Sequence, residues 1–124
     1  MLKIVHYLGE VGARAVIPAI AQPPADFGSA QKMFDQVFAH EQKVTRSIHE
    51  LIALANADND FGTLQFLQWY VAEQREEEAL MRNILDRIKL IGEGPMTLYY
   101  IDKEVDNINA ATTAGEATEG EAGA

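Results

Sequence analysis

The chain has 124 residues, of which 48% are hydrophobic, and this is enough for one small domain with a single core. Its formal net charge of −9 argues against nucleic acid and anionic membrane surfaces as partners, because no basic cluster is present to meet phosphate groups. The absence of cysteine excludes disulfides, iron–sulfur clusters and thiolate zinc sites, so carboxylate, amide or imidazole groups must hold any metal.

The first residues resemble the last turns of a helix. In residues 1–9, Leu2, Val5 and Leu8 share one face, and the glycines that follow are suitable stop signals. Three prolines then predict an extended connection over residues 13–29. The chain has no membrane-spanning segment and no signal peptide, which together with the absence of cysteine favours a cytoplasmic protein.

Two long amphipathic helices are expected over residues 30–57 and 61–91. Ser29 and Asp60 are good N-caps for them, and the short turn between them predicts antiparallel neighbours. Apolar residues recur at steps of three and four along each helix. The expected inward stripes are Phe34, Val37, Glu41, Val44, Ile48, Leu51 and Ala55 on the first helix, and Leu67, Tyr70, Gln74, Glu77, Met81, Ile84, Ile88 and Ile91 on the second.

Polar residues interrupt both stripes at similar heights. Glu41 lies about eighteen residues before the turn, and Gln74 and Glu77 lie about fifteen and eighteen residues after it. Unpaired buried carboxylates cost several kcal/mol each and repel one another, so these groups must be protonated, solvated, paired with a base or bound to a cation. A bound cation is the simplest solution, because residues three apart on a helix can reach one ion.

Acidic residues also cluster beside this position. Glu73, Glu76 and Glu77 share one helical face and can form a second, outer cation site. The alternative is that this run is a solvated helix surface, as most charge runs are. A shorter helix is expected over residues 96–108, with Leu98, Ile101, Val105 and Ile108 on one side, and residues 110–124 form a disordered tail of Ala, Gly, Thr and Glu.

Three stretches carry a resemblance to a known family. "AHEQKVTRSIHELIALA", "NDFGTLQFLQWYVAEQREEEALM" and "YYIDKEVDNI" are similar to the C-terminal part of bacterial non-haem ferritins. The resemblance implies an all-α fold, a partial ferritin-like domain over residues 1–109, that forms part of a four-helix bundle. In it, residues 1–9 would end the second helix, the extended segment would be the long crossover, and a short fifth helix would follow the third and fourth.

The resemblance also implies a function and the residues that perform it. The family assembles shells of 24 subunits, oxidises ferrous iron at a dinuclear centre with oxygen or peroxide, and stores ferric mineral. Glu41 matches the iron ligand of the third helix, and Gln74 matches the position beside the second iron. Glu73, Glu76 and Glu77 match ligands of the third iron site.

The chain departs from the family at its beginning. The first helix, with its Glu, and the Glu-x-x-His of the second helix have no counterpart, so three of the five dinuclear ligands are absent and the ferroxidase centre is incomplete. We expect a C-terminal fragment, arising from an internal start codon or a truncated or split gene. The alternative is a genuine non-catalytic helical hairpin that self-associates through its apolar stripe, with weak metal binding or none.

Overall fold

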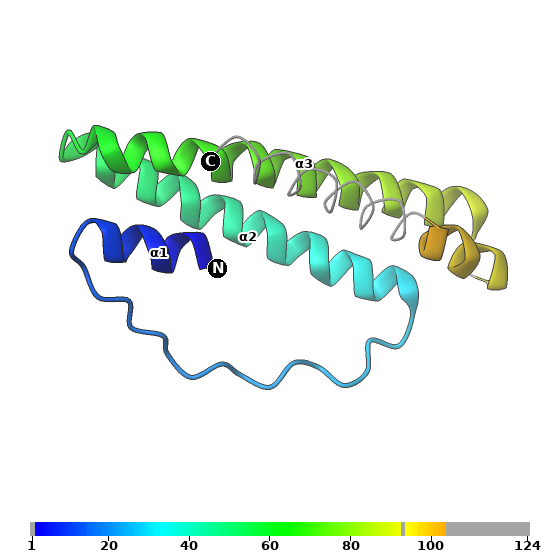
Figure 1. Ribbon diagram of the computed structural model, residues 1–124. Helices are drawn as coiled ribbons and strands as arrows, with labels where there is room; N and C mark the ends of the chain where they lie inside the picture. Colours follow the sequence, from blue (N-terminus) through cyan, green and yellow to red (C-terminus); the bar gives the residue numbers. More distant parts are fainter. Residues whose placement is uncertain (1, 93, 104–124) are drawn as a thin grey trace, which may run out of the picture.

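The computed structural model describes residues 2–92 and 94–103, and within them every regular element is a helix (Figure 1). Helix α1 spans Leu2–Glu10, α2 spans Ala30–Ala57 and α3 spans Phe61–Ile91. Residues 95–103 form a further helical segment. The all-α prediction is therefore confirmed. None of these helices has the length and apolar character needed to cross a membrane.

The two long helices form an antiparallel hairpin with the predicted bounds. The Ser29 hydroxyl accepts a hydrogen bond from the Lys32 amide at 3.2 Å, and the Asp60 carboxylate accepts one from the Thr63 amide at 3.0 Å. Both side chains satisfy amide groups that the first turn of a helix leaves unpaired. Between the helices, Asn59 takes a left-handed conformation with φ of 56°, which asparagine tolerates better than most residues.

The hydrophobic core lies between α2 and α3 and is densest toward the far end from the turn. Its largest cluster combines one residue of α2 with four of α3, namely Phe34, Met81, Ile84, Leu85 and Ile88. Nearer the turn, Ile48 and Ala55 of α2 and Leu67 of α3 are also buried. All of these positions except Leu85 lie on the predicted stripes, so helical periodicity identified most of the facing residues.

Parts of the predicted stripes are nevertheless exposed, and this corrects the sequence-based expectation. Leu51 is 47% exposed and Ile91 is 41% exposed, and Glu77 is exposed as well. The physical reason is that two helices in contact cover only a narrow strip of each other. The edges of a wider stripe remain open until further elements pack against them.

Helix α1 packs against the beginning of α3 through aromatic contacts. The rings of Tyr7 and Phe66 stack with centroids 4.0 Å apart and an interplanar angle of 7°. The hydroxyls of Tyr7 and Thr63 are hydrogen bonded at 2.9 Å. These contacts place α1 beside the α2–α3 turn (Figure 1).

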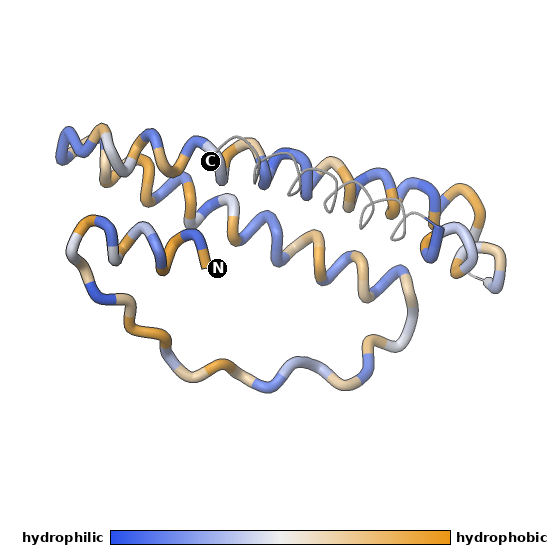
Figure 2. The backbone as a smooth tube through the Cα atoms, viewed as in Figure 1, coloured by the Kyte–Doolittle hydropathy of each residue, from blue (hydrophilic) through white to orange (hydrophobic). Residues whose placement is uncertain are grey.

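The segment from residue 13 to residue 29 contains no helix or strand, as predicted, and runs the length of the hairpin to reach the start of α2 (Figure 1). Several of its apolar side chains are solvent-exposed, including Val16 at 82% and Ile20 at 81%. Figure 2 shows the hydrophobic stretches along this segment. The hairpin thus carries a long apolar segment that its own core does not bury.

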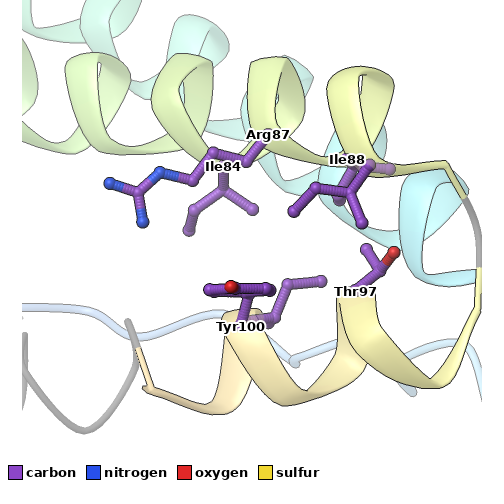
Figure 3. A pocket seen from close by; sticks show the side chains of 7 residues that line it. Ile84, Arg87, Ile88, Thr97 and Tyr100 are labelled. Atoms are coloured by element: carbon purple, nitrogen blue, oxygen red, sulfur yellow. The ribbon is translucent and has the colours of Figure 1, made fainter.

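After α3 the chain reverses and packs back on the helix end. Gly92 has a φ of 82°, which permits the reversal, and the Thr97 hydroxyl donates to the Gly92 carbonyl. Ile84, Ile88 and Tyr100 line a small pocket between α3 and residues 95–103 (Figure 3). The helix starts one residue before the predicted 96–108. Val105, Ile108 and the predicted tail lie outside the described residues.

Replacement of a core residue tests this packing. Ile88 is 1% exposed, so Ile88→Ala should lower the free energy of unfolding by about 2–5 kcal/mol through lost burial and a residual cavity. Leu90→Ala is the matched control, since Leu90 is 87% exposed on the same helix, and should change stability by less than about 0.5 kcal/mol. Urea unfolding followed by circular dichroism measures both, and equal effects would contradict the described core.

Candidate metal centre

Glu41 and Gln74 meet near the middle of the hairpin. The antiparallel arrangement places them opposite each other, and Gln74 Nε2 donates to the Glu41 main-chain oxygen and to Glu41 Oε2, both at 3.1 Å. Gln74 is only 8% exposed, whereas the Glu41 side chain is 22% exposed. The sequence predicted that this carboxylate and this amide lie at similar distances from the turn, and the structure brings them into contact.

The contacts of Gln74 explain how an amide is accommodated within an apolar stripe. A buried amide without partners loses its hydrogen bonds to water, at a cost of about 1–3 kcal/mol. Here the Nε2 group finds a main-chain oxygen, a carboxylate oxygen and the Thr45 hydroxyl oxygen, the last at 3.3 Å. The amide nitrogen is satisfied from the opposite helix, so the core accommodates this polar group.

Two further residues extend this arrangement across the helix pair. Thr45 Oγ1 lies 2.7 Å from Glu78 Oε1 and donates a hydrogen bond to it. Glu78 Oε2 in turn lies 3.2 Å from Arg82 Nη1. We refer to Glu41, Thr45, Gln74 and Glu78 as the polar cluster.

The sequence interpretation missed the part played by Thr45 and Glu78. Neither residue is among the candidate site residues that the sequence predicted. A signal was present, because Thr45 follows Glu41 by four residues and Glu78 follows Gln74 by four, so each shares a helix face with its partner. In an antiparallel pair these two steps run in opposite directions, so Thr45 comes level with Gln74 and Glu78 comes level with Glu41.

The outer acidic residues surround the polar cluster with negative charge. Partial burial of its carboxyl raises the pKa of Glu77, and the negative charges of Glu41, Glu73 and Glu76 raise it further. Glu41 belongs to the opposite helix, so carboxylates from both helices contribute to one field. A negative potential of this kind attracts cations.

The predicted metal ligands are brought together only in part. Glu41 and Gln74 are in direct contact, whereas Glu73, Glu76 and Glu77 are related through their charges. In the part of the chain that the structure describes, no three acidic or histidine side chains converge as a ready cation site. Metal binding by these five residues stays a prediction.

The histidine beside the cluster lies at its edge. The His40 side chain is 68% exposed, and its Nδ1 lies 3.6 Å from Glu41 Oε1. His40 therefore points away from the stripe. A protonated imidazole there would attract the Glu41 carboxylate only weakly, because exposed ion pairs are screened by water.

By its fold and its polar cluster, the protein is a helical-bundle protein with a polar centre between its two long helices. The family model described as the ferritin-like domain matches residues 1–91. The bacterial non-heme ferritin of Campylobacter jejuni is 42% identical over 106 residues, which cover 86% of this chain and 64% of that protein. The bacterial non-heme ferritin of Escherichia coli O6:H1 is 38% identical over 109 residues, covering 88% and 66%.

Solved structures agree with these relatives. An open pore ferritin from the hyperthermophilic archaeon Archaeoglobus fulgidus is 43% identical with a TM-score of 0.78, and the match covers 83% of this chain and 63% of that chain. A humanized archaeal ferritin is 42% identical with the same TM-score, covering 83% and 62%. The chain belongs to the ferritin family. It spans just under two thirds of the length of the curated relatives it matches.

The raised pKa of Glu77 predicts a pH dependence of stability. Between the ordinary glutamate pKa and the raised one, the folded chain binds more protons than the unfolded chain. The free energy of unfolding therefore falls as the pH rises through this window, and stays lowered above it. We expect Glu77→Gln to raise the thermal midpoint above the window and to have no effect below it.

Thermal unfolding followed by circular dichroism across this pH range measures the effect. Glu50→Gln is the matched control, because it removes the same charge from an exposed position on α2 outside the acidic group. Equal stabilisation by the two substitutions at every pH would show that net charge, rather than the local arrangement around Glu77, is responsible.

Proposed function

We propose that this chain is an iron-storage subunit of a ferritin shell, which when intact oxidises ferrous iron and deposits ferric mineral. The observation that carries the proposal is the contact between Glu41 and Gln74 across the long helices, in a chain that belongs to the ferritin family. The names of the bacterial and archaeal relatives support the same assignment.

The chemistry of these side chains fits ferrous iron as a substrate. Carboxylate and amide oxygens are suitable donors for a hard divalent cation, and neutral histidine adds nitrogen where it is available. A cation beside Glu41 would also relieve the repulsion between that carboxylate and Glu77. Glu73, Glu76 and Glu77 are proposed to hold a third ion and to help move iron inward, since their charges favour cation entry.

The incomplete ligand set limits what the chain does by itself. Glu41 and Gln74 provide two of the five dinuclear positions that the resemblance implies, so oxidation of iron requires the missing ligands. The full proposal therefore includes an intact subunit in a cytoplasmic shell of 24 copies, in which residues 1–109 belong to the bundle domain and residues 110–124 are an acidic tail.

A second candidate is a non-catalytic hairpin that self-associates through its apolar stripe. The observation in its favour is the apolar surface that the described residues leave open, since soluble monomers rarely expose large continuous apolar patches. The exposed apolar side chains belong to α1, α2, α3 and residues 13–29, and they include Leu2, Val16, Ile17, Ile20, Leu51, Leu54, Phe61 and Leu90.

Anaerobic titration with ferrous iron tests the metal site. We expect the chain to bind Fe²⁺, and Glu41→Gln to weaken binding by more than about tenfold, because the amide removes the charge that holds the ion. Glu50→Gln is the control for general surface charge and should leave the affinity unchanged. Identical affinities in all three proteins would contradict a site at Glu41.

Sedimentation velocity, together with measurement of oxygen consumption, separates the two candidate functions. For the intact subunit, the storage proposal predicts a large hollow assembly and oxygen consumption when Fe²⁺ is added. The hairpin alternative predicts a small oligomer without oxygen consumption. A stable dimer that consumes no oxygen would therefore reject the storage function for this chain and favour the alternative.

A further inference from the structure

The orientation of the Gln74 amide decides which of its ends can face a cation. The two ends have nearly the same shape, but the oxygen accepts hydrogen bonds whereas the nitrogen donates them. In the structure, the nitrogen faces three oxygen atoms of α2, two from Glu41 and one from Thr45. The oxygen is therefore the end that remains for an ion.

Thr45 accepts from Gln74 because its own proton is directed elsewhere. A hydroxyl has one proton, and two acceptors lie near Thr45 Oγ1: the Glu41 main-chain oxygen at 3.1 Å and Glu78 Oε1 at 2.7 Å. The shorter, charge-assisted bond to the carboxylate is the stronger of the two. The proton therefore goes to Glu78, and a lone pair of Thr45 faces the Gln74 amide.

Glu78 imposes this direction because an ionised carboxylate only accepts hydrogen bonds. Its second oxygen is 3.2 Å from Arg82 Nη1, a contact that restricts the side chain. The side chain of Glu78 is only 19% exposed, so water competes poorly for it. Gln74 thus donates to Thr45, Thr45 donates to Glu78, and Glu78 also accepts from Arg82.

We infer that Thr45 and Glu78 are positioning residues, which hold the Gln74 amide with its nitrogen toward α2 and its oxygen toward the ion. The part of the inference that concerns the ion rests on the proposed function, whereas the orientation of the amide does not. A reversed amide would direct its oxygen at the acceptor atoms of Glu41 and would present N–H groups to the cation.

Two substitutions disturb the order in different ways. Glu78→Gln supplies an amide that can donate to Thr45, which frees the hydroxyl proton to bond the Gln74 oxygen in the reversed orientation. Thr45→Val keeps the shape of the side chain but removes the hydroxyl. Thr45→Ser keeps the hydroxyl and serves as the conservative variant that should restore the behaviour of the unsubstituted chain.

The first measurement uses the metal-free chain labelled with ¹⁵N-glutamine. The side-chain amide signal of Gln74 is assigned by its loss in Gln74→Glu, and its hydrogen exchange with water is followed by NMR. We expect exchange to be about three- to tenfold faster in Glu78→Gln and Thr45→Val, since one hydrogen bond is weakened or lost, and unchanged in Thr45→Ser. Equal exchange rates in all variants would overturn the inference.

The second measurement compares the Fe²⁺ affinity of Thr45→Val in two backgrounds. A carboxylate presents oxygen at both ends, so in Gln74→Glu there is no amide orientation left to control. Thr45→Val should weaken binding in the native background and have little effect in the Gln74→Glu background. An equal loss in both backgrounds would indicate that Thr45 acts only through packing and would contradict its positioning role.

The two measurements separate this inference from the proposed function. If the unsubstituted chain binds no Fe²⁺, the proposed function fails and the exchange measurement alone decides the amide orientation. Thermal midpoints of all variants show whether any change follows from loss of folding. Should Thr45→Val unfold, Glu78→Gln and Thr45→Ser still provide the decisive comparison, because both retain a side chain of similar size.

Discussion

The rest of the structure depends on the register of α2 against α3, which the short capped turn at Asp58, Asn59 and Asp60 establishes. Antiparallel helices joined by so few residues can slide little against each other. This register places Glu41 against Gln74, and Thr45 and Glu78 join them from neighbouring turns of the two helices. A shift of a single turn would separate the carboxylate from the amide and remove the Glu41 oxygens that the buried Gln74 nitrogen bonds.

The polar cluster is stabilised in a way that differs from a simple buried ion pair. Gln74 is neutral, so its burial requires hydrogen bonds but not a countercharge. The charged members, Glu41 and Glu78, keep partial contact with solvent. Glu77 lies toward the edge, where partial burial of its carboxyl raises its pKa and repulsion from nearby carboxylates raises it further. The arrangement thus combines a well-satisfied interior with an excess of negative charge at its edge, and an added cation would reduce that excess.

The distribution of apolar surface is the second constraint on function. The α2–α3 contact buries the facing strips, whereas apolar side chains at the stripe edges and along residues 13–29 remain exposed. Surfaces of this kind are covered when further elements or further copies pack against the hairpin. The chain matches just under two thirds of the length of its relatives. The open apolar edges are consistent with that partial match, because further elements would cover them.

The sequence by itself determined the two long helices, their ends and most of the residues with which they face each other. Helical periodicity, the caps Ser29 and Asp60, and the glycines after α3 are local features, and local features act through neighbours in the chain. Equal distance from the turn also predicted the meeting of Glu41 with Gln74. Only the tertiary structure decided which stripe positions are covered. Leu51 and Glu77 lie on the predicted stripes but are exposed, because burial depends on which residues pack opposite them. It alone showed the direction of hydrogen bonding through Thr45 and Glu78, since that direction depends on distances between side chains of separate helices.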